Sequence, residues 1–106
     1  MTDDPAGGLD EAFRSVTRLR ISAFLSACDE AEFRAVQDYC QLSPSLLSKN
    51  VSGLEELGYV TVRKGRVGRT PRTWLALSDE GRTALAGHLA ALSAIAEEAS
   101  RHARNA

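Results

Sequence analysis

The sequence predicts one mainly helical α+β domain, and three observations lead to this fold class. A short helix and a well-capped amphipathic helix follow one another with almost no linker between them. The hydrophobic period then changes from helical to two, which is typical of a β-hairpin. The remainder of the chain returns to helical spacing. With 106 residues, of which 43% are hydrophobic and 25% charged, the chain suits a single domain with a genuine core.

Residues 1–8 are the exception to this globular composition. They contain little apolar surface, and they lack the cationic start and apolar run of a targeting sequence. We therefore expect a flexible leader at 1–8 and the folded domain at 9–106. No apolar run in the chain is long enough to span a bilayer, so the sequence predicts a soluble, cytoplasmic protein with no membrane partner.

Two helices are expected ahead of the amphipathic one. The first covers 9–28, with a break, because its large apolar residues fall mostly at helical spacing. A polar turn at 29–32 precedes a short helix at 33–40, whose expected core contacts are Val36, Tyr39 and Cys40.

The amphipathic helix has both ends marked. Ser43 can accept hydrogen bonds from the first turn, Pro44 suits the first helical position, and Gly58 can adopt the left-handed conformation that ends a helix. Apolar residues between these limits recur at steps of four and three. They predict one buried stripe, made of Leu47, Val51 and Leu54.

The opposite flank of this helix carries short polar side chains and one cation, namely Ser45, Ser48, Lys49 and Ser52. Such a face can approach a nucleic-acid groove without steric or charge conflict. Taken alone, the pattern favours a solvated surface helix. The short link to the preceding helix matches the helix-turn-helix arrangement, however, and this favours the nucleic-acid interpretation.

A β-hairpin with a basic tip is expected next. Its strands are predicted at 59–63 and 72–77, and the turn-rich loop at 65–71 contains Gly65 and Gly68, which allow a tight tip. Trp74 is expected to alternate inward with Ala76 and to join the core. The Gly65–Gly68 spacing also matches the GXXG loop of KH domains, but that loop joins helices, so an RNA interpretation is less favoured.

The charge is distributed unevenly. From Gln41 to Ser78 there are six cations and two anions, a net charge of +4, whereas the whole chain carries −1, which leaves −5 for the remainder. A basic segment in an otherwise acidic molecule can direct a polyanion to one face. The hairpin is the main contributor, with Arg63, Lys64, Arg66, Arg69 and Arg72.

A long helix is predicted at about 79–101, capped by Ser78. Its apolar residues follow a coiled-coil-like seam of Leu85, Leu89, Leu92, Ala96 and Ala99, with Ile95 beside them. The seam can fold onto the chain's own core or pair with the first helix of a second chain. We favour the dimer because the seam extends past what a minimal domain can cover. The expected interface comprises Phe13, Leu85, Leu89, Leu92, Ile95, Ala96 and Ala99.

The order of the elements and the residue patterns of several motifs resemble those of one protein family. Arg18-Leu19-Arg20-Ile21 resembles its RLRIL motif, and the runs 47–49 and 54–60 resemble its LSRHL and LEEAGYV segments. The runs 68–73 and 77–82 resemble GRRPRT and LTPEGR. On these motifs the chain is similar to the small single-domain winged helix-turn-helix transcriptional regulators related to the MarR and ArsR families.

This resemblance implies sequence-specific binding of double-stranded operator DNA by a homodimer. The fold it implies is a winged helix-turn-helix with a two-stranded hairpin wing and a long C-terminal dimerisation helix. The recognition helix would contact bases in the major groove through Ser43, Ser45, Ser48, Lys49, Asn50 and Ser52. The wing would contact the minor groove or phosphates through Arg63, Lys64, Arg66, Arg69 and Arg72.

The chain departs from the family pattern at three positions of the amphipathic helix. Ser52 and Gly53 stand where relatives commonly have basic residues, and Asn50 stands in place of the usual histidine. A glycine inside a helix costs roughly 1 kcal/mol relative to alanine. Gly53 is therefore either a weak point or a place where a groove or another helix approaches closely.

Other chemistry is poorly supported by the sequence. Cys28 and Cys40 lack metal-ligand spacing and are expected to be buried thiols, and His88 and His102 are expected to be exposed or interfacial. We expect no cofactor, metal or enzymatic activity. The alternatives are a winged-helix module that binds protein partners without DNA, and a sensor whose DNA affinity responds to oxidation at the cysteines or to a small-molecule effector that the sequence does not identify.

Overall fold

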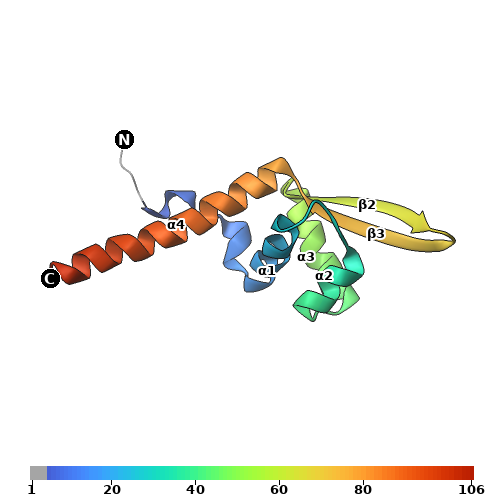
Figure 1. The fold of residues 1–106 in the computed structure, drawn as a ribbon, viewed down its shortest axis with the longest axis horizontal. Coiled ribbons are helices and arrows are strands. Elements are labelled where there is room, and N and C mark those ends of the chain that lie inside the picture. Colours follow the sequence, from blue (N-terminus) through green and yellow to red (C-terminus); the bar gives the residue numbers. More distant parts are fainter. Residues whose placement is uncertain (1–4) are drawn as a thin grey trace.

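The computed structural model describes residues 5–106, and it arranges two short 3-10 helices, four α-helices and three strands along the chain. In order these are η1 (Pro5–Gly8), η2 (Glu11–Arg14), α1 (Val16–Ser26), β1 (Ala31–Glu32), α2 (Phe33–Cys40), α3 (Pro44–Glu56), β2 (Val60–Val67), β3 (Thr70–Leu77) and α4 (Asp79–Arg104). The molecule is elongated, 64 × 28 × 21 Å. Helices α1, α2 and α3 form its middle, the β2–β3 hairpin extends to one side and α4 to the other (Figure 1).

The break predicted in the first helix is confirmed. Asp10 caps η2 and Ser15 caps α1, where the Ser15 hydroxyl accepts a hydrogen bond from the Arg18 backbone at 3.3 Å. Helix α1 contributes Ile21 and Leu25 to the core. Around them pack buried apolar residues from η2, α2, α3, α4 and the sheet, including Phe13, Val36, Leu47, Leu54, Val60, Leu75, Leu77 and Leu85.

The helix-turn-helix pair, α2 and α3, forms as predicted. Gln41 ends α2 in the left-handed conformation, with φ of 53°. The Ser43 hydroxyl then caps α3 by accepting from the Leu46 backbone at 3.2 Å, and Gly58 follows α3 with φ of 78°. Tyr39, expected in the core, is instead 52% exposed and packs its ring against Phe24 at 5.0 Å.

The sheet has three strands, in the order β1-β3-β2, where the sequence predicted two. The segment predicted as a polar turn contains β1, which pairs antiparallel with β3 through Ala31 opposite Leu75 and Glu32 opposite Trp74. Two residues are too few to display an alternating pattern, so this strand has no signature of its own in the sequence.

The hairpin is longer and its turn is shorter than predicted. The strands pair as far as Val67 opposite Thr70, which leaves only Gly68 and Arg69 in the turn. Gly68 has φ of 62°, and a glycine with positive φ at the first central position is typical of a type II′ hairpin. Gly65 lies within β2 opposite Arg72, so the expectation that it shapes the tip is wrong.

The inward face of β3 is the one opposite to that predicted. Leu75 and Leu77 are buried, whereas Trp74 and Ala76 lie only partly covered on the other face. The alternation was identified correctly but in the wrong phase. The bulk of the indole favoured burial, yet the helices cover the leucine face.

Helix α4 begins at its predicted cap, where the Ser78 hydroxyl accepts from the Gly81 backbone at 3.0 Å, and it ends at Arg104, slightly beyond the predicted limit. Residues 1–4 of the expected flexible leader lie outside the described residues. Pro5–Gly8 is a 3-10 helix that packs along α4 (Figure 1), rather than an unstructured leader. None of the described helices combines the length and apolar character needed to cross a membrane.

Candidate nucleic-acid interface

Helix α3 divides into a buried stripe and an exposed polar face. Leu47, Val51 and Leu54 are buried in the core, as predicted, and Ser45, Ser48, Lys49 and Ser52 are exposed. Two other residues expected to contact DNA already have partners within the helix. The Asn50 amide donates to the Leu46 carbonyl at 2.9 Å, and the Ser43 hydroxyl is the cap. The side chains of Ser48, Lys49 and Ser52 form no hydrogen bond or ion pair among residues 5–106, and Ser45 has only the Ser43 hydroxyl, at 3.4 Å. These four side chains are the ones available to a groove.

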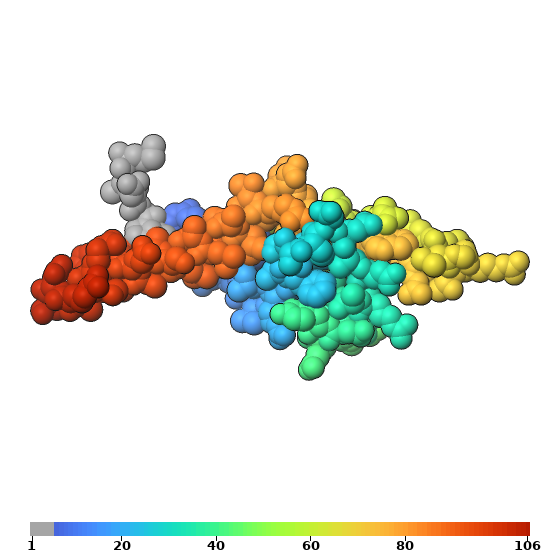
Figure 2. All heavy atoms as spheres, in the orientation of Figure 1, coloured from blue at the N-terminus to red at the C-terminus, as the bar shows by residue number. Residues whose placement is uncertain are grey.

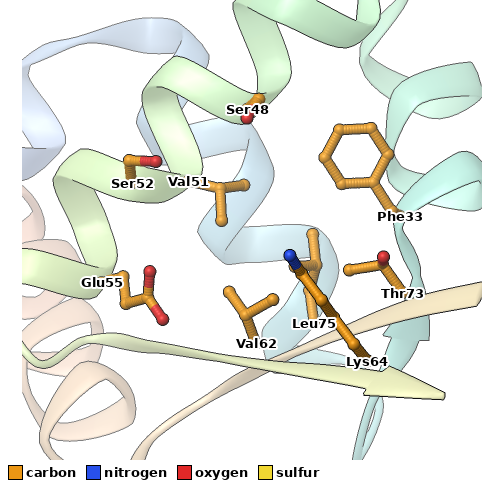
Figure 3. Close-up of a pocket in the computed structure, with 9 residues that line it drawn as sticks. All are labelled: Phe33, Ser48, Val51, Ser52, Glu55, Val62, Lys64, Thr73 and Leu75. Carbon is orange, nitrogen blue, oxygen red and sulfur yellow. The ribbon is translucent and has the colours of Figure 1, made fainter.

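A cleft of about 360 Å³ separates this face from the wing, which is the β2–β3 hairpin (60–77). Figure 3 shows Ser48 and Ser52 on the α3 wall, with Lys64 extending from the strand toward them. Val62 and Leu75 form the floor beside Val51. The full lining is Phe33, Ser48, Val51, Ser52, Glu55, Val62, Lys64, Thr73 and Leu75. Because strand residues alternate, Arg66 shares the cleft-side face of β2 with Lys64.

Two of the five wing cations are paired with carboxylates. Arg63 donates to Glu30 from Nη2 at 2.6 Å and from Nε at 3.3 Å, and Arg72 donates to Glu32 at 3.4 Å. The hydrogen bond from Arg63 lowers the pKa of Glu30, and the same bond raises the pKa of Arg63. The positive charges of Arg63 and Arg72 are thus largely compensated by carboxylates of the same chain. Glu30 and Glu32 were not anticipated, since both lie in the segment predicted as a turn.

The other three wing cations, Lys64, Arg66 and Arg69, are exposed and form no salt bridge among residues 5–106. Arg66 donates to the Arg69 carbonyl at 3.3 Å, which draws its guanidinium toward the tip of the hairpin. The wing therefore presents three unpaired cations on the strand β2 and the turn, while Arg63 and Arg72 tie it to the β1 region.

The long helix presents an apolar stripe to solvent. Leu89, Leu92 and Ile95 are 45%, 44% and 37% exposed, and Ala96 and Ala99 are exposed beside them. Figure 2 shows the C-terminal part of α4 projecting away from helices α1–α3. Phe13 and Leu85, which were also expected at a dimer interface, are buried in the chain's own core instead. Phe13 stacks on Tyr59, with ring centroids 5.8 Å apart.

The expectation that His88 is exposed or interfacial is wrong. Its side chain is buried, with 4% exposed, and its Nδ1 accepts a hydrogen bond from the Asp10 backbone at 3.0 Å. Its partner lies 78 residues away, which no local pattern reveals. His102 is exposed, and its Nδ1 lies 3.0 Å from the Glu98 carbonyl.

Both cysteines are free. Cys40 is buried, as expected, and burial raises its pKa, whereas Cys28 is only partly buried. Among the residues that the structure describes, no group of three or more histidine, cysteine or acidic side chains is placed to hold a metal ion. Among the described residues, the polar side chains that form the candidate site are the exposed serines and lysine of α3 and the cations of the wing.

The family model for the winged helix DNA-binding domain matches residues 17–96, which include α2, α3, the wing and most of α4. The chain belongs to this family. The resemblance inferred from the motifs is thereby confirmed, and similar solved structures include MarR-family transcriptional regulators.

Individual relatives agree with this assignment. The chain is 27% identical over 77 residues to the uncharacterized protein MJ0432 of Methanocaldococcus jannaschii, covering 73% of this chain and 84% of that one. It is 28% identical to a transcriptional regulator homologue from Pyrococcus horikoshii, with a TM-score of 0.71 over 83% of this chain and 92% of that one. PadR of Bacillus subtilis, solved in complex with operator DNA, shares the fold at 19% identity and a TM-score of 0.62, over 71% of this chain and 48% of that one.

Proposed function

We propose that this protein is a homodimeric transcriptional regulator that binds double-stranded DNA sequence-specifically, with α3 in the major groove and the wing on the minor groove or on phosphates. One observation carries the proposal. The exposed hydroxyl and lysine face of α3 borders a cleft whose other side is a wing with three unpaired cations. A surface of this kind offers donors and acceptors to base edges and positive charge to the flanking backbone.

Helix α3 and the wing would make different contributions to DNA binding, the helix through base contacts and the wing through phosphate contacts. Helix α3 carries a single cation, Lys49, so its serines would read bases while contributing little salt-dependent affinity. Lys64, Arg66 and Arg69 would supply most of the phosphate attraction, because contacts to phosphates release counterions and make binding depend on salt. Arg63 and Arg72 would contribute less, since each already faces a carboxylate.

The exposed stripe of α4 supports the dimer. An apolar stripe at coiled-coil spacing is stabilised when a second helix covers it. A two-fold dimer would present two copies of α3 to half-sites roughly 34–36 Å apart, which is about one turn of DNA. Its contacts would come from Leu89, Leu92, Ile95, Ala96 and Ala99, because Phe13 and Leu85 are already enclosed in the chain's own core.

DNA binding is tested by selecting duplexes from a random library and measuring affinity over a salt series. We expect selected sequences with two related half-sites. The double variant Arg66→Ala with Arg69→Ala should reduce the salt slope by up to about 2 units, at about 0.9 per phosphate contact. Arg101→Ala with Arg104→Ala, near the C-terminal end of α4, is the matched control and should leave it unchanged. Failure to bind any duplex would refute the proposal and favour a protein-interaction module.

The dimer is tested by solution mass. Wild-type protein is expected at twice the chain mass, and Leu92→Glu with Ile95→Glu should yield monomers, because charge on the stripe opposes its burial. The control is Val67→Glu at the wing tip, an exposed apolar residue far from α4 (Figure 1), and this variant should remain dimeric. A monomeric wild type, or a dimer that survives the double substitution, would refute this interface.

A further inference from the structure

The Arg18 side chain occupies the space that a side chain at position 53 would fill. A Cβ on Gly53 would overlap the Arg18 Nη2 atom and lie 2.9 Å from its Cζ. Gly53 belongs to α3 and Arg18 to α1, so the glycine lets a long side chain from one helix cross the surface of the other. The alternatives left open by the sequence for this glycine are resolved in favour of close approach by a neighbouring helix.

The charge of Arg18 is not neutralised within the described chain. Arg14, Arg63 and Arg72 each form a salt bridge, whereas Arg18 forms neither a salt bridge nor a side-chain hydrogen bond among residues 5–106. The side chain is partly buried. A partly desolvated guanidinium without a partner is unfavourable, and an external anion would relieve that cost.

The position of Arg18 is defined by the geometry of α3. Ser48, Ser52 and Glu55 line the cleft and therefore mark the wing side of the helix. Successive residues of an α-helix are turned by about 100°, so Gly53 lies on the flank of the polar face that is away from the wing. Lys64 approaches α3 from one flank (Figure 3), and Arg18 lies against Gly53 on the other.

We propose that Arg18 contacts a DNA phosphate and adds, from α1, a second positive charge to the flank of α3 that already carries Lys49. This inference rests on the proposed function. A helix in the major groove lies between two phosphate backbones, and the groove is about 12 Å wide. The wing contacts one backbone, and Arg18, held across the bare helix surface at Gly53, contacts the other. The glycine is the element that makes this contact possible, because any larger residue displaces the guanidinium.

The test compares Arg18→Ala with Arg14→Ala over a salt series on a selected duplex. Arg14 lies four residues earlier, in η2, is exposed, and is paired with Glu11. We expect Arg18→Ala to reduce the salt slope by about 0.9 and to weaken binding at low salt several-fold, with Arg14→Ala close to wild type. Thermal melting of each variant separates this effect from loss of fold.

A second variant makes the assignment sharper. Adding Gly53→Arg to Arg18→Ala places a guanidinium on the same flank from α3 itself, and we expect the slope to return to the wild-type value. A wild-type protein that binds no duplex would overturn both the proposed function and this contact. Wild-type binding with an unchanged slope in Arg18→Ala, or a lost slope that Gly53→Arg fails to restore, would overturn the contact alone.

Discussion

The guanidinium of Arg63 lies over the indole of Trp74, 4.1 Å from the ring centroid. The two residues are directly opposite one another across the β2–β3 pairing. The same guanidinium donates to both carboxylate oxygens of Glu30, beside β1. The stack and the ion pair together attach the wing to the segment before α2. Trp74 is the single tryptophan of the chain, so its fluorescence reports on this attachment.

The attachment should weaken in acid. Because the hydrogen bond from Arg63 lowers the pKa of Glu30 in the folded protein, its contribution is complete above the ordinary glutamate pKa and is lost as the pH falls through the lowered value. We expect an acid transition in Trp74 fluorescence that Glu30→Gln abolishes. Asp79→Asn, a change of an exposed carboxylate on α4, is the control. Identical acid profiles for wild type and Glu30→Gln would contradict the coupling.

Alkaline pH should act through Tyr59. Its hydroxyl donates to Asp10 at 2.5 Å, and this hydrogen bond, aided by burial, raises the pKa of Tyr59. The resulting stability is complete below the ordinary tyrosine pKa and is lost as the pH rises through the raised value. Asp10→Asn, which retains a side chain able to cap η2, should move the tyrosinate absorbance transition to lower pH. Because the chain has two tyrosines, the titration is made in a Tyr39→Phe background, where Tyr59→Phe should remove the transition. A titration unaltered by Asp10→Asn would exclude the carboxylate as its cause.

Two glycines of α4 should respond oppositely to alanine. A Cβ on Gly81 would overlap the Tyr59 carbonyl oxygen and lie 3.1 Å from Leu77, whereas a Cβ on Gly87 would have only the Gly8 carbonyl oxygen nearby, at 3.8 Å. We expect Gly81→Ala to destabilise the protein by about 1–3 kcal/mol through overpacking. Gly87→Ala should stabilise it by up to about 1 kcal/mol through helix propensity. Denaturant titration measures both, and equal effects at the two positions would contradict the close approach at Gly81.

The two thiols should differ in reactivity. Burial raises the pKa of Cys40 and limits its access to reagents, while Cys28 is only partly covered. The thiolate is the reactive form, so a disulfide reagent should label Cys28 first. The single-thiol variants Cys40→Ala and Cys28→Ala allow the two rates to be measured separately. Faster labelling of Cys40 would require that α2 opens readily, which its packing against the core opposes.

Much of the fold could be predicted because its signals are local. The caps at Ser43 and Ser78 each bond a backbone N–H three residues away, and Gly58 ends α3 through its own φ. The stripe of Leu47, Val51 and Leu54 follows from helical periodicity. These features depend only on residues that are close together along the chain, so they can be predicted from the sequence pattern. The exposed serines of α3 belong to the same class, since they are the complement of the buried stripe.

The features that could not be predicted from the sequence depend on residues that are far apart along the chain. Arg63 meets Glu30 across 33 positions, Arg72 meets Glu32 across 40, and the Asp10 backbone meets His88 across 78. The phase of β3, the third strand and the Arg18 contact at Gly53 likewise arise from which surfaces the packed helices leave open. The sequence by itself determined the helices, the caps at Ser43 and Ser78, the presence of a hairpin and the net positive charge of the wing. Only the tertiary structure decided which of those charges remain unpaired, because pairing depends on distance in space.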